Sequence, residues 1–332
     1  MTIYDIAKEA GVSASTVSRV MNNKPGIKAE TRERVMAVVK KNNFAPDETA
    51  RGLVRQATKT IGLLVADVRI TNYMMGIHSI ITAMAEQGYC CIVIDTGMDS
   101  AARAEYVKIL SQRRVEGAIL VGSGYQCPEV EEAIRLYLGN VPVVIVNGVI
   151  DMPNVYSVFS DERRGTAMCF DYVFEKGYKH PVYIGCGSEA DNERRIEGIN
   201  DSIARNAPGM NVPLYIAESP FKCGYYDTRT ALEEHPETDV IVYSADCFAV
   251  AGMCMLQELG VKVPEQLGFI AAEESVYSTV SHPYMTSLDS KVEYACREAC
   301  DIMLNIFSGE ENRKTVMLEP GINERETTRE MN

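Results

Sequence analysis

The sequence predicts an α/β protein in which a small helical head precedes a larger body of doubly wound parallel sheets. Apolar residues recur with helical spacing in the first 42 residues, and from residue 60 short apolar runs alternate with amphipathic stretches. The runs form two successive series, which indicates two sheet-containing halves. Continuous apolar strands between helices are typical of parallel sheets covered on both faces. A length of 332 residues suits two or three domains.

Composition is that of a soluble globular protein, but the charge is unevenly distributed. The chain is 46% hydrophobic and 24% charged, and no run approaches the roughly 18–20 apolar residues of a membrane span. Residues 1–60 hold 11 basic and 6 acidic residues, a net charge of +5, whereas the whole chain carries −13 and the remainder therefore −18. A basic head on an acidic body favours contact with a polyanion, with chance unevenness of a solvated surface as the alternative.

The N-terminus shows no basic segment followed by an apolar one. It therefore does not predict a secretory signal, and we expect a cytoplasmic protein without a membrane association.

Two short helices joined by a tight turn are predicted at the start of the chain. Thr2 with Asp5 is typical of a helix N-cap followed by a carboxylate in the first turn. Gly11 suits a turn that requires positive φ, and Ser13 can cap a second helix. This pattern predicts a helix-turn-helix, and a third helix is expected over residues 29–42.

The second helix carries outward side chains that suit DNA. With the capping serine they are Ser13, Ala14, Ser15, Thr16, Ser18 and Arg19. Hydroxyl groups bond phosphate oxygens, and a guanidinium bonds guanine O6 and N7 in the major groove. We therefore predict that Arg19 reads a base. A helical hairpin that merely packs on another domain is the alternative.

A specific motif covers most of these two helices. It reads Asp5-Ile6-Ala7-Lys8-Glu9-Ala10-Gly11-Val12-Ser13, followed by Ser15-Thr16-Val17-Ser18-Arg19-Val20. This stretch resembles the head of the lac-repressor-type (LacI/GalR) family of bacterial transcription regulators, and the resemblance continues more loosely through the whole chain. It implies an effector-responsive regulator that binds a palindromic operator in double-stranded DNA as a homodimer. Of the two kinds of regulator, a repressor is favoured. It implies neither a cofactor nor enzymatic activity.

A hinge is predicted at residues 46–59, after a head of residues 1–45. Pro46 suits a first helical position, but so short a helix is marginal in water by itself. The resemblance implies that the segment becomes helical on DNA and that Arg51, Leu53 and Arg55 lie at the DNA, with the leucine wedged into the minor groove. A plain interdomain linker is the alternative.

The two series of apolar runs predict two lobes with a ligand cleft at the carboxyl ends of their strands. The runs lie at residues 61–65, 90–94, 118–121 and 141–146, and then at 182–184, 214–217, 240–243 and 267–271. The resemblance implies a body like that of a periplasmic sugar-binding protein. Its first lobe would comprise residues 60–159 and 289–318, and its second lobe residues 160–288 and 319–332.

The resemblance implies candidate ligand-binding residues in matching motifs of the body, namely Asn72, Asp161, Arg195, Asp246 and Glu273. Tyr73 and Phe221 could supply apolar walls of the cleft, with a place in the core as the alternative. Arg195 offers five donors and Asp161 only accepts, a pairing that suits a small polar effector, with a sugar-like molecule favoured. Both residues have a structural alternative. Arg195 could form a surface salt bridge with neighbouring charges, and Asp161 could cap a helix. For Asp246 we favour the cap.

The chain also departs from the family pattern. Ala245 stands where asparagine is usual, and Glu273 stands where aspartate is usual, so the effector is expected to be unusual. Control by a partner protein, or by thiol or metal chemistry, is the alternative. Cys296 and Cys300 would share a helical face, but no metal site is expected because zinc sites usually need four suitably spaced ligands.

Two other classes of protein fit less well. The sequence contains no Gly-x-Gly-x-x-Gly after a strand, no Walker loop and no Gly-x-Ser-x-Gly, so a dehydrogenase or a hydrolase is poorly supported. A plain small-molecule binding protein is disfavoured by the basic helical head.

Overall fold

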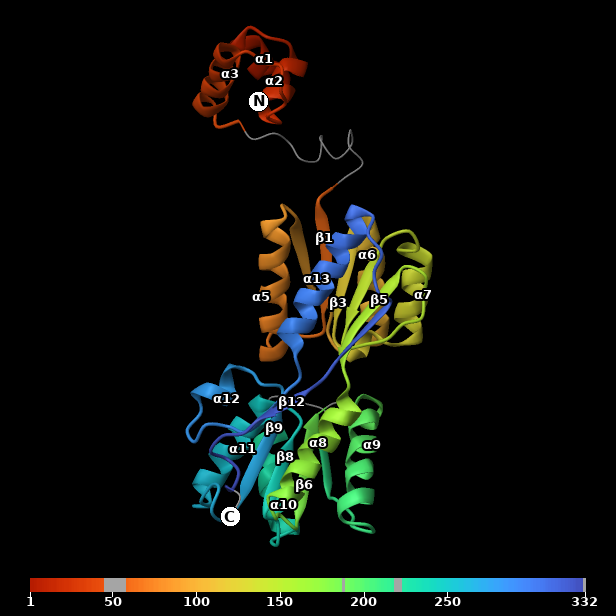
Figure 1. The fold of residues 1–332 in the computed structure, drawn as a ribbon, viewed down its shortest axis with the longest axis vertical. Helices are drawn as coiled ribbons and strands as arrows, with labels where there is room; N and C mark the ends of the chain where they lie inside the picture. The colour runs from red at the N-terminus through yellow and green to blue at the C-terminus, as the bar shows by residue number, and fades with distance from the viewer. Residues whose placement is uncertain (45–57, 187–188, 218–222, 331–332) are drawn as a thin grey trace. The chain divides into compact units, whose positions relative to one another are not determined.

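The computed structural model describes residues 1–44, 58–186, 189–217 and 223–330. The chain divides into two compact units, Met1–Lys59 and Thr60–Asn332, each with its own core. The first unit is helical, and the second contains two six-stranded sheets with helices on both faces (Figure 1). The predicted fold class is confirmed.

Three helices form the described part of the head: α1 (Ile3–Ala10), α2 (Ala14–Met21) and α3 (Ala29–Lys41). Thr2 and Asp5 build a capping box at α1, and Gly11 ends that helix with a φ of 66°. The three helices bury a small aliphatic core, which consists of Ile6, Ala7, Ala10, Val17, Val20, Val35 and Val39. The helix-turn-helix predicted from the sequence is confirmed.

The first sheet is parallel throughout and has the strand order β11-β5-β4-β3-β1-β2. Its strands are β1 (Thr60–Val65), β2 (Cys90–Asp95), β3 (Gly117–Val121), β4 (Val143–Val146), β5 (Val155–Ser160) and β11 (Thr315–Leu318). The helices of this lobe are α5 (Thr71–Glu86), α6 (Ser100–Gln112), α7 (Pro128–Tyr137) and α13 (Val292–Ser308), with a short 3-10 helix, η1 (Ser123–Tyr125).

Helices α5 and α13 cover one face of the first sheet, and α6 and α7 cover the other (Figure 1). The alternation of strand side chains shows this directly. Leu63 and Val65 of β1 belong to the core with α5 and α13, whereas Leu64 belongs to the core with α6 and α7.

The second sheet has the order β12-β10-β9-β8-β6-β7, and only β12 pairs antiparallel among its described strands. The strands are β6 (Pro181–Cys186), β7 (Leu214–Ala217), β8 (Val240–Tyr243), β9 (Gly268–Ala272), β10 (Ser287–Asp289) and β12 (Gly321–Asn323). The helices are α8 (Glu162–Glu175), α9 (Glu189–Asn206), α10 (Cys223–Glu234), α11 (Asp246–Glu258) and α12 (Val276–Val280). Helices α8 and α9 cover one face, while α10 and α11 cover the other.

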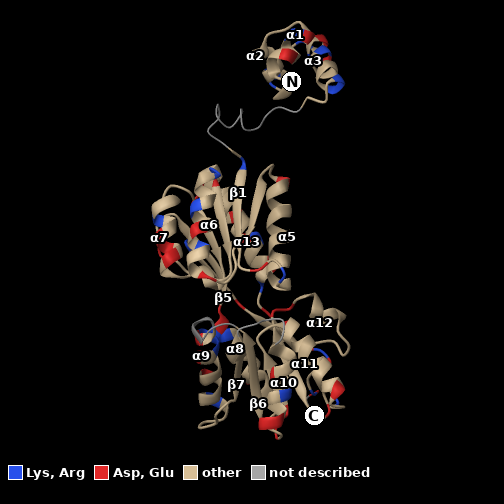
Figure 2. Ribbon diagram, turned by 180° about the vertical axis from the view of Figure 1, so that it is seen from behind, with Lys and Arg blue, Asp and Glu red and all other residues tan. Residues whose placement is uncertain are grey.

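The chain passes between the two sheets at three places. It leaves the first sheet after β5, returns after β10, and leaves again between β11 and β12. The described strands contain only two charged residues, Asp95 and Asp289, and both end their strands, while many Lys, Arg, Asp and Glu residues lie on the helices (Figure 2). Within the described strands, charged side chains therefore occur only at the ends. No helix among the described residues is long and apolar enough to span a membrane.

Helices α8 and α9 pack so closely that one position requires glycine. A Cβ at Gly198 of α9 would lie 2.2 Å from the carbonyl oxygen of Arg163 and 3.1 Å from the amide nitrogen of Ala167. Because two backbones meet here, neither can move aside as a flexible side chain would.

Gly198→Ala should therefore lower the free energy of unfolding of the body by about 1–3 kcal/mol. An unstrained glycine in a helix would respond oppositely, since alanine is usually better by about 0.5–1 kcal/mol. Urea denaturation measures the difference. Gly321→Ala is the control, because a Cβ there meets nothing within 4 Å. An equal effect of both substitutions would show that the close approach of α8 and α9 does not matter.

Candidate functional site

The N-terminus of α2 carries a cluster of hydroxyl groups. Ser13 caps the helix by accepting a hydrogen bond from the amide of Thr16 at 3.2 Å. Its Oγ also lies 2.8 Å from Oγ of Ser15 and 2.9 Å from Oγ1 of Thr16. Ala14 and Ser18 are partly exposed on the same helix. Hydroxyl donors at the positive end of a helix dipole suit a phosphate group.

Arg19 on α2, like Arg34 on α3, differs from Arg32, the third arginine among the described residues of the head. Its side chain is exposed and forms no hydrogen bond or ion pair with any described residue. Arg32, by contrast, donates to Asn23 at 2.7 Å and to the carbonyl of Lys24 at 3.0 Å, so it has a structural role. The guanidinium of Arg19 is left available for an external partner. The hinge residues Arg51, Leu53 and Arg55 lie outside the described residues.

In the body, side chains from both lobes meet where the strands end. Asn72 and Tyr73 lie in the first turn of α5, after β1 of the first lobe, and Glu273 follows β9 of the second lobe. The Asn72 amide lies close enough to the Glu273 carboxyl group to lower its pKa. Glu162 at the start of α8 and Arg195 on α9 complete the group. We call these five residues the interlobe site.

Arg195 is held by an acidic residue from a neighbouring helix. Its Nη2 donates to Oε1 of Glu162 at 3.0 Å, and the charge of Glu162 raises the pKa of the guanidinium. Arg195 thus forms a salt bridge, the alternative role considered for it, but with Glu162 and not with a residue adjacent in sequence; Glu197 pairs with Arg163 at 3.0 Å. Residues two apart on a helix point in different directions, which disfavours a pair of Arg195 with Glu193 or Glu197.

Burial raises the pKa values of two further titratable groups of the interlobe site, Glu273 and Tyr73. Desolvation raises the pKa of Glu273 to about 8, with a further contribution from the charge of Asp246, while Arg195 and Asn72 act in the opposite direction. Desolvation also raises the pKa of Tyr73 to about 12, and the charges of Glu273 and Glu162 add to this effect. Tyr73 is therefore a neutral phenol at physiological pH.

Asp161 caps α8, the alternative considered for it, and its carboxylate pairs with Arg194 and not with Arg195. Its carboxylate accepts from the amide of Arg164 at 3.3 Å and from Nη2 of Arg194 at 3.3 Å. The adjacent Glu162, which was not among the candidate residues, is the acidic partner of Arg195. Phe221, the remaining apolar candidate, lies outside the described residues.

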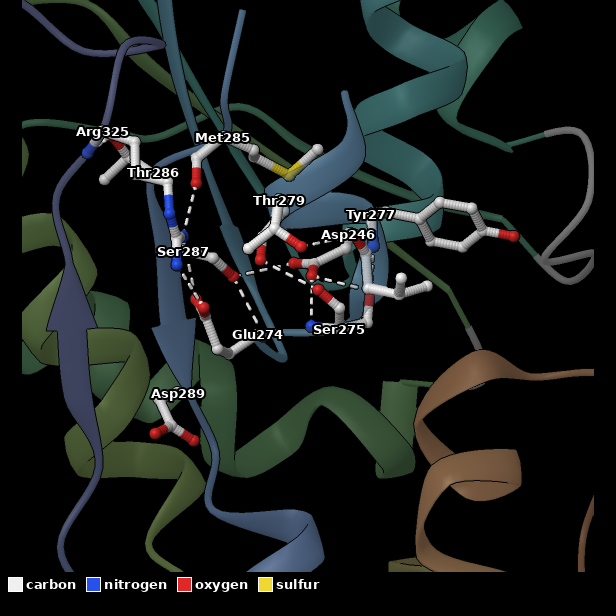
Figure 3. A network of polar contacts seen from close by, with 12 residues as sticks. Asp246, Glu274, Ser275, Tyr277, Thr279, Met285, Thr286, Ser287, Asp289 and Arg325 are labelled. Atoms are coloured by element: carbon white, nitrogen blue, oxygen red, sulfur yellow. Dashed lines mark hydrogen bonds and ion pairs between the residues drawn. The ribbon is translucent and has the colours of Figure 1, made fainter. Parts of the chain in front are cut away.

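Asp246 corrects the sequence prediction. Helix α11 has Ala245 at its N-cap, without a side-chain cap, so the favoured interpretation of Asp246 as the cap is wrong. Its fully buried carboxylate accepts instead from the amide and Oγ of Ser275, at 2.6 and 2.8 Å, and from Oγ of Ser287 at 2.8 Å (Figure 3). The structure does not support a direct ligand contact either, because both oxygens are occupied and the side chain has no exposed surface.

This network fixes the loop that carries Glu273. Glu274 has a positive φ of 55°, a strained conformation for a residue with a side chain. Its carboxylate binds both terminal nitrogens of Arg325, which also donates to the carbonyl of Met285 at 2.8 Å (Figure 3). Its amide donates to Oγ of Ser287 at 3.0 Å. Asp246 and Arg325 are thus positioning residues for the Glu273 loop.

The paired cysteines are part of the core. Cys296 and Cys300 are buried on α13, and desolvation raises the pKa of both thiols. A thiol held in this form is a poor nucleophile and a poor metal ligand. Within the described ranges, no group of three or more His, Cys, Asp and Glu side chains is placed to hold a metal ion.

Two family models together match nearly the whole chain. Residues 2–47 match bacterial regulatory proteins of the lacI family, and residues 58–323 match the periplasmic binding proteins and sugar binding domain of the LacI family. The chain belongs to the lacI family of bacterial regulatory proteins. The resemblance read from the head motif is confirmed, and the chain is a DNA-binding transcription regulator with a ligand-binding type of body.

Individual relatives are distant but span the full length. An HTH-type transcriptional regulator of Lachnoclostridium phytofermentans is 24% identical and covers 95% of this chain and 96% of its own. The HTH-type transcriptional repressor PurR of Vibrio campbellii is 26% identical, with coverage of 100% and 99%. Among solved structures, the lac repressor dimer bound to operator and the anti-inducer ONPF has a TM-score of 0.87 at 21% identity, with 99% of both chains covered.

The raised pKa of Glu273 predicts a pH-dependent stability. The folded state holds a proton between about pH 4.5 and 8 that the unfolded state has lost, so unfolding becomes easier as pH rises through this window. Glu273→Gln removes the free-energy cost of ionising a buried carboxyl group. Its advantage in unfolding free energy over the wild type should grow by on the order of 2–3 kcal/mol between pH 6 and pH 9.

Glu274→Gln provides the contrast, because it breaks the pair with Arg325 and should destabilise the body at both pH values. Urea denaturation at the two pH values tests both expectations. A Glu273→Gln advantage that is the same at pH 6 and pH 9 would contradict the assignment.

Proposed function

We propose that the protein is a repressor that binds a palindromic operator as a homodimer and responds to a small polar effector in the interlobe site. The single observation that carries the proposal is the unpaired, exposed Arg19 on a helix whose N-terminus presents hydroxyl groups. A relative is named the repressor PurR, and a similar structure is a repressor bound to its operator, which supports the same assignment. Such a regulator acts on chromosomal DNA, in the cytoplasm.

The effector mechanism follows from the position of the interlobe site. Asn72 and Tyr73 belong to one lobe, while Arg195 and Glu273 belong to the other. A ligand that bonds to both sets favours the arrangement of lobes in which they face each other, and so shifts the population of conformations. In a dimer this shift changes the spacing of the two heads and the order of the hinge.

Exposed apolar side chains on the body support a dimer. Met74 of α5 is 51% exposed and Val280 of α12 is 67% exposed, and Tyr284 beyond α12 is 49% exposed. Large exposed apolar residues are thus available on both lobes for contact with a second copy of the chain.

Arg19→Ala should weaken binding to the specific operator by about 1–3 kcal/mol, or roughly 5- to 150-fold, and relax discrimination at one position of each half-site. Binding to random DNA should change much less, because phosphate contacts supply most of it. Gel shifts with specific and random duplexes at one salt concentration measure both. Arg34→Ala, on an exposed position of α3, is the matched control. Equal weakening on both duplexes by Arg19→Ala would refute base reading.

Leu53→Ala should reduce operator affinity and DNA bending while effector binding stays intact. The reason is that an apolar wedge lowers the cost of kinking the minor groove only when it is inserted. Bending is measured by circular-permutation gel shift, and hydrogen exchange of the hinge is compared with and without operator. Unchanged bending in Leu53→Ala would contradict the proposed insertion of this leucine into the minor groove.

A further inference from the structure

We propose that the interlobe site takes a ligand that carries a protonated amine, such as an amino sugar, in preference to an uncharged polyol. This inference rests on the proposed function, since it names the ligand class of the same site. It is drawn from the charges and unfilled acceptors of this chain.

The carboxylates around the site differ in their partners. Five of them, at or just after the ends of β1, β5, β9 and β10, have a basic partner. These pairs are Asp67–Arg69, Asp161–Arg194, Glu162–Arg195, Glu274–Arg325 and Asp289–Lys291. Asp246 lacks a base but has three donors from Ser275 and Ser287. Glu273 has no Lys or Arg within ion-pair distance in the described part of the chain, and its neutral neighbour Asn72 is a weaker partner than any of these.

Asn72, the neutral neighbour of Glu273 from the other lobe, holds a second acceptor. Asn72 is 7% exposed, and its Oδ1 is buried without a donor among the described residues. Leaving such an acceptor unfilled costs free energy, so a native site normally supplies a donor from protein, water or ligand. The unfilled acceptor of Asn72 and the carboxyl group of Glu273 thus belong to neighbouring residues of the interlobe site.

An ammonium group matches these two acceptors better than a hydroxyl group does. It has up to three N–H donors and a positive charge, whereas a hydroxyl has one donor and no charge. Arg195 neutralises Glu162, so the five residues of the interlobe site carry a net charge of −1 when Glu273 is ionised. A bound cation stabilises this ionised state, whereas beside a neutral ligand Glu273 keeps its proton at neutral pH.

Proton release provides a signature of the amine. The groups facing Glu273 are Asn72 and Tyr73 on α5, Glu162 on α8, Arg195 on α9, and Asp246 and Cys247 on α11. Without a cation, the raised pKa of Glu273 keeps it largely protonated at neutral pH. An ammonium beside the carboxyl group lowers this pKa again, so amine binding at pH 7 should release up to one proton per site.

The test is calorimetry on the full chain with three matched pairs of probes: glucosamine with glucose, galactosamine with galactose, and mannosamine with mannose. Titration at pH 7 in phosphate and in HEPES, which differ in ionisation enthalpy, counts the protons released. We expect at least one amine to bind at least 10-fold more tightly than its hydroxyl counterpart, with proton release. Hydroxyl members that bind as well as or better than the amines overturn the proposal, as does the absence of binding by every amine.

Substitutions connect the preference to Glu273. Glu273→Gln should abolish both the amine preference and the proton release, while Glu273→Asp should retain them because it keeps the charge. Glu265→Gln, an exposed position of the same lobe, is the matched control for loss of one carboxylate. An amine preference that survives in Glu273→Gln would overturn the assignment. Operator binding is measured in parallel by gel shift, so failure of the amine proposal with DNA binding intact is distinct from failure of the proposed function.

Discussion

The covering of both sheet faces by helices is the constraint on which the body depends. Strands in this position are buried on two sides, so nearly all their residues are apolar, and the two aspartates that they contain stand at their ends. Polar groups can then gather only where strands stop. Asn72, Glu162 and Glu273 all follow strand ends, and two lobes placed end to end bring these positions together across one interface. The location of the interlobe site is thus a consequence of the fold, while its chemistry is set by a handful of loop residues.

A loop that presents a poorly compensated carboxylate must itself be held firmly. Glu273 precedes a residue with positive φ, and both cost free energy that the surroundings offset. The buried bonds of Asp246 to Ser275 and Ser287, with the pairing of Glu274 and Arg325, provide this support from three separate segments of the chain. One of these segments is β10, at which the chain returns to the first lobe. The network therefore ties the geometry of the site to a connection between the lobes.

Sequence reasoning predicted the elements whose signal is local. The capping box of Thr2 and Asp5, the turn at Gly11 and the apolar strands β1 and β8 each depend on residues close together in the chain. It did not predict β5 from an apolar run, because Ser157 and Ser160 interrupt the apolar residues of that strand, nor β10 and β12, which have three residues each. It assigned Asp246 as a cap because a helix start is a local feature, whereas its real partners are 29 and 41 residues away. The Glu162–Arg195 and Glu274–Arg325 pairs, separated by 33 and 51 residues, leave no local pattern either.

The departures from the family pattern acquire a physical meaning in this setting. The side chain of Ala245 has neither a donor nor an acceptor at the start of α11. The polar side chain there is that of Asp246, which accepts hydrogen bonds from Ser275 and Ser287 of the second lobe. Glu273 then faces the first lobe with Asn72 as its neutral partner. An ionised carboxylate in this position lowers the free energy of unfolding above neutral pH. A sequence optimised for stability would replace this residue or place a basic side chain beside it. Natural sequences keep such unfavourable groups where binding requires them, because the partner that compensates the charge is the ligand itself.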